Sequence, residues 1–165
     1  HFPAINWLTS YSLYTDNMGS WFDENVSDKW MSDRQRLMGL LQDEAELDEI
    51  VKMVGMDALS AEDRLKMEAA RSIREDFLHQ NSFHEVDTYT SLKKQFLMME
   101  LVIAFYDKSL EALKQGASAQ KLINMAVRER IGRYKYTLDE NIDAEYEKIN
   151  NELHIEIANL LGREE

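Results

Sequence analysis

Apolar side chains recur at steps of three and four residues along most of the chain beyond about position 27, a spacing typical of amphipathic helices. The clearest run is typical of a long helix packed along its length on others. Its apolar positions are Tyr89, Leu92, Phe96, Met99, Ile103, Tyr106, Leu110 and Leu113. With only one proline and six glycines, the chain has few residues that break helices. The pattern predicts an all-α fold, a helical bundle of about five to six helices.

Glycine and serine residues mark the expected helix boundaries. Gly55 and Gly116 follow the last apolar positions of two helices, and a glycine there can adopt the left-handed conformation that favours a helix C-terminus. Ser60, with an acid three residues later, is typical of a capping box, in which the serine hydroxyl accepts a backbone N–H. Ser118 is the expected N-cap of a short helix. A last helix runs nearly to Glu165.

Each expected helix presents one apolar face to the core. The face of the first helix comprises Leu37, Leu40, Leu41, Leu47, Ile50, Val51 and Val54. The next comprises Leu65, Ala69, Ile73 and Phe77. The short helix carries Leu122, Ile123, Ala126 and Val127, and the last carries Ile142, Tyr146, Ile149, Leu153, Ile157 and Leu160. Arg128, Arg130 and Arg133 lie near the negative end of the short helix, so we expect a structural role for them.

The charge balance limits the possible partners, since 19 Lys and Arg face 31 Asp and Glu and the net charge is −12. Such a chain repels phosphate backbones, so nucleic acid is not an expected partner. The longest strongly apolar run, Phe96–Phe105, contains Glu100 and is far shorter than the roughly 20 residues that span a bilayer. We therefore expect no direct membrane insertion. The lack of cysteine excludes disulfides and suits a reducing compartment.

Residue types that carry catalysis or bind metals lack the spacing that these functions need. The six glycines never cluster as a phosphate-binding loop requires. The histidines at positions 1, 79, 84 and 154 form no His-x-x-x-His or Glu-x-x-His pair, so we expect no metal site. Neighbouring acids such as Glu44 and Glu46, or Glu164 and Glu165, are more often a solvated helix face than an acid–base pair. We therefore expect no catalytic residue in this chain.

Phe83, Val86 and Tyr89 are spaced three residues apart, so a helix that begins near Phe83 brings them to one side. Such a group could stack on a flat ring, although an apolar stripe at helical spacing is more often part of a core. The first 26 residues are less regular and rich in aromatic side chains that can pack on the bundle. The chain starts at His1 with an apolar segment unlike a signal peptide, so we expect a piece of a longer protein.

Two segments carry a resemblance to a known family. The run Phe-Leu-His-Gln-Asn-Ser-Phe-His-Glu-Val-Asp-Thr-Tyr at 77–89, preceded by Ile-Arg-Glu-Asp, resembles the catalytic A subunit of vacuolar and archaeal-type rotary ATPases. Phe2–Ser12 resembles the segment with which that subunit leaves its nucleotide-binding domain, and similarity continues through 47–55 and 93–105. The resemblance implies that residues 1–26 are this exit segment and that residues 27–165 are the C-terminal helical domain.

For nucleotide binding, the resemblance implies an adenine pocket with Phe2 on one side of the base and Phe83 on the other, lined by Val86 and Tyr89. Stacking on aromatic faces suits a purine, because it contributes about 0.5–1.5 kcal/mol beyond area burial. ATP or ADP would bind with Mg²⁺ in the full subunit. The fragment alone is not expected to be catalytic or to bind a nucleotide tightly.

A second site is implied by the segment Gly55–Leu65, which is similar to the acidic stalk-contacting loop of the F-type ATP synthase β subunit. Two positions that are acidic in the F-type loop are Ala58 and Ala61 here. The resemblance implies that this loop contacts the central stalk of the rotary enzyme. The expected contact residues are Met56, Asp57, Ala58, Leu59, Ser60, Ala61, Glu62, Asp63 and Arg64.

The resemblance also implies the setting of the full subunit. Its partners would be non-catalytic B subunits, in a hetero-hexameric ring, and the central stalk subunits. The subunit would couple ATP synthesis or hydrolysis to proton or sodium transport, in a cytoplasmic head peripheral to the membrane. Two alternatives stay open: a freestanding helical adaptor whose apolar stripes bind a partner helix, and the B subunit or F-type β subunit, which resemble Phe2–Tyr11 and Phe77–Tyr89 less.

Overall fold

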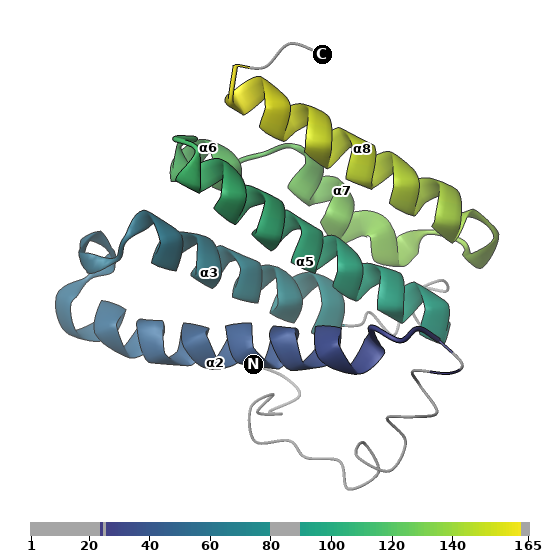
Figure 1. Ribbon diagram of the computed structural model, residues 1–165. Coiled ribbons are helices and arrows are strands. Elements are labelled where there is room, and N and C mark those ends of the chain that lie inside the picture. Colours follow the sequence, from purple (N-terminus) through teal and green to yellow (C-terminus); the bar gives the residue numbers. More distant parts are fainter. Residues whose placement is uncertain (1–23, 25, 80–89, 163–165) are drawn as a thin grey trace, which may run out of the picture.

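The computed structural model describes residue 24 and the ranges 26–79 and 90–162, and every regular element in these parts is a helix (Figure 1). The α-helices are α2 (Trp30–Val54), α3 (Ala61–Ser72), α5 (Leu92–Lys114), α6 (Ala119–Ile123), α7 (Val127–Arg133) and α8 (Ile142–Leu160). Short 3₁₀ turns are η1 (Met56–Ala58), η3 (Tyr134–Tyr136) and η4 (Asp139–Asn141), and η2 (Ile73–Leu78) is a π-helix. The predicted all-α helical bundle is confirmed.

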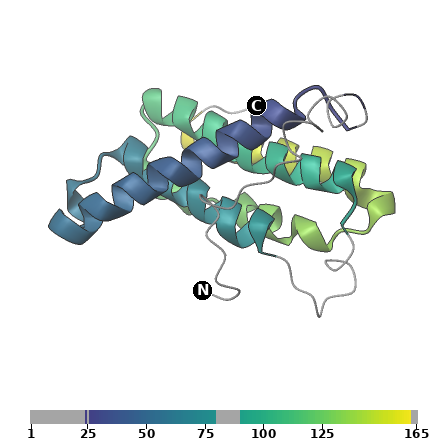
Figure 2. The ribbon, with the colours of Figure 1, turned by 90° about the horizontal axis from the view of Figure 1, so that it is seen from below.

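The helices stack around α5 in successive layers. Helices α2 and α3 form an antiparallel pair, α5 packs on both of them, and α8 packs on the other side of α5 (Figure 1). Helix α7 contacts α8, α5 and η2, whereas the short helix α6 bridges α3 and α8. The turn between α2 and α3 projects beyond the ends of α5 and α6, as both ribbon views show (Figure 2).

Helix α5 forms the centre of the core because other helices cover it on several sides. Its buried apolar residues are Leu97, Met98, Met99, Leu101, Val102, Ile103, Phe105, Tyr106 and Ala112. The predicted seam is confirmed at Met99, Ile103 and Tyr106, while Leu92 at the start of the helix is exposed. A helix that is apolar nearly all round is a buried one, which explains the apolar run in the sequence.

The predicted helix boundaries are confirmed where they depend on local chemistry. Ser60 Oγ accepts the backbone N–H of Asp63 at 3.1 Å, and Ser118 Oγ accepts that of Lys121 at 3.4 Å. Gly55 ends α2 with a φ of 88°, a backbone conformation that side chains with a Cβ disfavour.

The single short helix predicted after Ser118 is wrong, because the structure has two helices, α6 and α7, with a break at residues 124–126. Glu156 on α8 accepts the backbone N–H groups of Ala126 (3.0 Å) and Val127 (2.8 Å), which stabilises a new helix start. Arg128 donates to the carbonyl of Ile123 at 2.7 Å, at the end of α6. In both cases the capping side chain belongs to a different helix from the end that it caps, so hydrophobic periodicity does not reveal it.

The end of the second predicted helix also differs from a regular α-helix. Helix α3 continues into the π-helix η2, where the N–H of His79 bonds to the carbonyl of Arg74 at 3.1 Å. Ile73 is fully buried, and Phe77 is partly buried against the core. Helix α7 approaches η2 so closely at Gly132 that a Cβ there would lie 2.9 Å from the Asp76 carboxylate. Glycine permits this contact because it lacks a Cβ. Gly132 lies within α7 and does not end the helix.

Candidate functional site at the helical tip

The segment Met56–Arg64, which we call the tip loop, joins the two helices that project from the bundle. It begins after Gly55 with the turn η1 and ends in the first turn of α3. Leu59 is only 7% exposed and anchors the loop between the helix ends. The N-cap Ser60 fixes where α3 starts. Most of the remaining loop side chains are exposed, namely Met56, Asp57, Ala58, Ser60, Ala61 and Glu62.

Apolar side chains gather on the surface beside this loop. Ile50, Met53, Val54 and Met56 are exposed by 44%, 82%, 65% and 49%, and we call these four residues the tip patch. The prediction that the whole apolar face of the first helix is buried is therefore wrong, since Ile50 and Val54 lie outside the core. Within the described ranges, the other exposed large apolar residues, at 92, 138 and 155, are scattered along the chain. An exposed apolar group at a projecting end is typical of a contact surface.

The charges of the tip loop are weakly paired within the described chain. Arg64 Nη2 lies 3.7 Å from the Asp57 carboxylate, whose side chain is fully exposed. Glu62 and Asp63 stand in the first turn of α3, where the helix dipole favours negative charge. With alanine at the two positions that are acidic in the similar loop, the tip combines apolar contact area with only a few charges.

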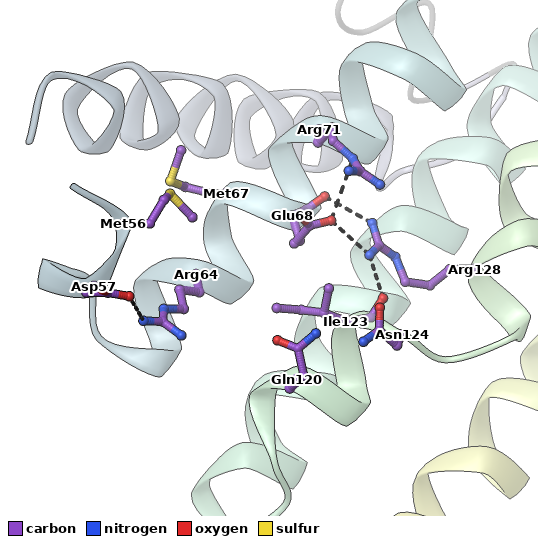
Figure 3. Close-up of a pocket in the computed structure, with 10 residues that line it drawn as sticks. All are labelled: Met56, Asp57, Arg64, Met67, Glu68, Arg71, Gln120, Ile123, Asn124 and Arg128. Carbon is purple, nitrogen blue, oxygen red and sulfur yellow. Dashed lines mark hydrogen bonds and ion pairs between the residues drawn. The ribbon is translucent and has the colours of Figure 1, made fainter. Parts of the chain in front are cut away.

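A groove opens beside the tip loop, between α3 and α6, with a volume of about 410 Å³ (Figure 3). Met56, Asp57 and Arg64 line its outer end, whereas Arg128 lines its inner end. The sequence analysis missed this groove, because its two walls come from helices about 50 residues apart in the chain and no local pattern joins them.

Arg128 is held firmly at the inner end of the groove. It donates to Glu68 Oε2 at 2.9 Å and to the carbonyl of Ile123 at 2.7 Å (Figure 3). It also donates to Ser72 Oγ at 2.9 Å. Its guanidinium also lies 4.7 Å from the ring centroid of Phe105, a cation–π contact. The expected structural role is confirmed for Arg128, although its partners are Glu68 and Ser72 on α3 and the C-terminal end of α6 rather than the end of its own helix.

The expected adenine-pocket residues Phe2, Phe83, Val86 and Tyr89 all lie outside the described residues. Of the described chain, the nearest residues in sequence to the 83–89 group are His79 and Thr90.

Two buried lysines that the sequence analysis did not single out donate hydrogen bonds to backbone carbonyls in this region. Lys135 Nζ donates to the carbonyl of His79 at 3.4 Å. Lys94 is fully buried and donates to the carbonyls of Lys135 and Thr137, the latter at 2.7 Å. Each lysine bonds to backbone groups more than 40 residues away, so no sequence pattern indicated it.

Within the described parts of the chain, no three His, Cys, Asp or Glu side chains converge as a metal site would require. The acid Glu44 has a structural role, since it accepts two hydrogen bonds from Arg74, at 2.6 and 3.0 Å. None of the described helices is both long and apolar enough to cross a membrane.

The fold and the tip define an all-α helical domain with a projecting apolar end. A family model described as the C-terminal domain of V and A type ATP synthase matches residues 19–123, and the chain belongs to this family.

Relatives cover nearly the whole chain. It is 54% identical to the V-type ATP synthase alpha chains of Acetivibrio thermocellus and Clostridioides difficile, and 52% identical to that of Clostridium novyi. Each match covers 99% of this chain and 28% of the relative. The chain therefore spans little more than a quarter of the length of these alpha chains.

Proposed function

We propose that this chain is the helical coupling domain of the catalytic subunit of a rotary V/A-type ATP synthase or ATPase, and that its tip contacts the central stalk. The exposed tip patch at the projecting end of α2 and α3 is the observation that carries this proposal. Apolar area exposed on a fixed protrusion suits a contact with another protein. Family membership supplies the kind of complex in which that contact would occur.

We expect the bundle to move as a rigid body. Its buried residues form a single apolar cluster that includes residues of α2, α3, α5, α7 and α8. Because protein interiors are close-packed and resist compression, a displacement at one end of such a body is transmitted to the other. Nucleotide-dependent motion in the rest of the subunit would therefore swing the tip against the stalk, and stalk rotation would drive the reverse motion.

The nucleotide itself would be bound mainly by the rest of the subunit. ATP or ADP and Mg²⁺ would react there, since phosphoryl transfer needs a phosphate-binding loop, Mg²⁺ and a group that orients water. From this chain, Phe2, Phe83, Val86 and Tyr89 would contribute one wall of the adenine pocket. The neighbours would be B subunits in a hetero-hexameric ring, in a head peripheral to the membrane.

The test replaces three of the four tip-patch residues in the assembled complex. The variant Met53→Ser/Val54→Ser/Met56→Ser should keep the melting temperature of the domain, because exposed side chains contribute little to folding. Ion transport per ATP hydrolysed should fall about tenfold, as expected when central apolar contacts of an interface are removed. Transport into vesicles and ATP hydrolysis are measured on the same preparation.

Leu138→Ser/Ile155→Ser is the matched control, because these residues are similarly exposed but lie away from the tip in the sequence. Its coupling should equal that of the parent complex. If the tip variant and the control transport equally well, the proposed stalk contact is wrong.

A further inference from the structure

We propose that the groove between α3 and α6 binds an acidic segment of the protein that contacts the tip, with carboxylates of that segment hydrogen-bonded to Arg64 and Arg71. The inference rests on the proposed function, because the groove opens directly beside the tip loop. The proposed function specifies where the contact lies, and this inference specifies the chemistry of the partner.

Arg64 and Arg71 have unused hydrogen-bonding capacity within the described chain. Within the described chain, the only ion pair of Arg64 is the 3.7 Å contact with Asp57, on a side chain that is 39% exposed. Arg71 Nε lies 3.6 Å from Glu68 and 3.7 Å from Glu75, on a side chain that is half exposed. Separations of this length are longer than hydrogen bonds, so both guanidinium groups can still donate hydrogen bonds to a closer carboxylate.

The internal acids of the groove do not fill this capacity. Glu68 already accepts a hydrogen bond from Arg128 at 2.9 Å, and Asp57 is fully exposed to solvent. Three arginines against two carboxylates line the groove, in a chain whose net charge is −12. With Glu75 counted beside Arg71, these charges balance, so the groove repels an acidic partner less than the rest of this acidic chain does.

The spacing of the two arginines defines the occupant further. Arg64 and Arg71 are seven residues apart on α3, which corresponds to about 10 Å along the helix axis. Two carboxylates match this separation when they are seven residues apart on a helix or three apart on an extended segment. Each could form a two-point hydrogen bond with its guanidinium. Met56 and Ile123, which also line the groove, offer apolar contact beside the charged groups.

Carbodiimide coupling tests the proposal, because this reagent joins lysine amines, but not arginines, to carboxylates. Arg64→Lys and Arg71→Lys are made separately in the full-length subunit, and the assembled complex is treated with the reagent. Mass spectrometry should find residue 64 or 71 linked to an Asp or Glu of another subunit. Arg133→Lys is the control, because Arg133 is exposed on α7 and does not line the groove. Links confined to this chain, or equal intersubunit linking from the control, would overturn the proposal.

A binding measurement separates this inference from the proposed function. Arg64→Gln/Arg71→Gln should weaken association of the subunit with its tip partner about tenfold and flatten the salt dependence of binding. If the tip-patch variant weakens association and the arginine variant does not, the groove inference fails while the stalk contact stands. If neither weakens it, both fail.

Inorganic phosphate tests for a free anion as the occupant. Calorimetric binding of phosphate to the full-length subunit that Arg64→Gln/Arg71→Gln abolishes would contradict a carboxylate segment. No such heat is expected.

Discussion

At the residue scale, two carboxyl groups meet where α2 packs on α5. Asp33 is buried on α2, and it interacts with Glu100 on α5. Burial, reinforced by the hydrogen bond and the negative charge of Asp33, raises the pKa of Glu100 to about 7, although Lys29 and Arg36 act in the opposite direction. Near neutral pH, a proton on Glu100 therefore favours the packed helices.

Glu100→Gln should make stability less dependent on pH. The raised pKa means that the folded chain holds this proton more tightly than the unfolded chain. The contribution of Glu100 to the free energy of unfolding is therefore lost as pH rises from about 4.5 to about 7. The melting temperature of the variant relative to the parent should therefore increase between pH 5 and pH 8. Glu46→Gln, an exposed change on α2, should show no such trend. A constant difference for Glu100→Gln across this range would contradict the assignment.

Which single residues sequence analysis could find depended on how far away their partners are. Ser60 and Ser118 were predicted as caps, because a cap bonds to a backbone N–H only three residues away. Lys94 and Arg128 were not singled out for their hydrogen bonds, because the main partners of each lie about 40 to 60 residues away in the chain. Such bonds appear only once the helices have been placed.

At the element scale, the periodicity of α2 predicted a helix but overestimated its buried length. Leu37, Leu40 and Leu41 are buried, as expected, while Ile50 and Val54 at the end of the same apolar face are exposed. Periodicity is a property of one helix, whereas burial requires a neighbour. No described element covers the end of α2 beyond its contacts with α3 and η1. The two residues that were expected to be buried but are exposed, Ile50 and Val54, therefore both belong to the tip patch.

The start of α7 provides a test of capping by a distant side chain. Glu156→Ala would leave the N–H groups of Ala126 and Val127 without their carboxylate partner. We expect a loss of about 1 kcal/mol in the free energy of unfolding, and faster hydrogen exchange across residues 126–130. Exchange is followed by mass spectrometry at residue resolution. Glu147→Ala, on an exposed position of α8, should leave exchange in α7 unchanged. Equal protection of α7 in both variants would refute the cap.

At the scale of the whole molecule, ion pairs around the apolar core link most of the described helices to one another. Arg36 bonds to Asp107 between α2 and α5, at 2.7 Å, and Arg130 links α7 to two glutamates of α8. Exposed pairs of this kind contribute little individually. Arg128 differs, because its side chain is largely buried and joins α7 to α3 and to the end of α6.

Arg128→Leu should destabilise the whole domain by about 2–4 kcal/mol, because it leaves Glu68 partly buried without its main partner and removes the hydrogen bond to Ser72. Urea unfolding followed by circular dichroism measures this loss. Arg133→Leu is the matched change on the same helix, where the ion pair is exposed and 3.9 Å long. It should stay within about 0.5 kcal/mol of the parent. A small effect of Arg128→Leu would mean that α6 and α7 are held by apolar contacts alone.

The global architecture was more predictable than the site. Helical spacing predicted the all-α bundle, and the resemblance at Phe77–Tyr89 indicated the family that the comparison of residues 19–123 shows. The tip loop was expected from its similarity to another loop, and the structure places it at a projecting end. The groove beside it could not be expected, because Arg64 and Gln120 become neighbours only through tertiary packing.

The tip patch also governs how the free chain behaves in solution. Its exposed apolar side chains favour self-association of the chain, whereas the electrostatic repulsion between copies with a net charge of −12 opposes it. Salt screens that repulsion over a Debye length of about 10 Å at 0.1 M, but it leaves the apolar attraction in place. The solubility of the free chain therefore depends on its acidity, since the large excess of Asp and Glu opposes aggregation through the exposed tip patch.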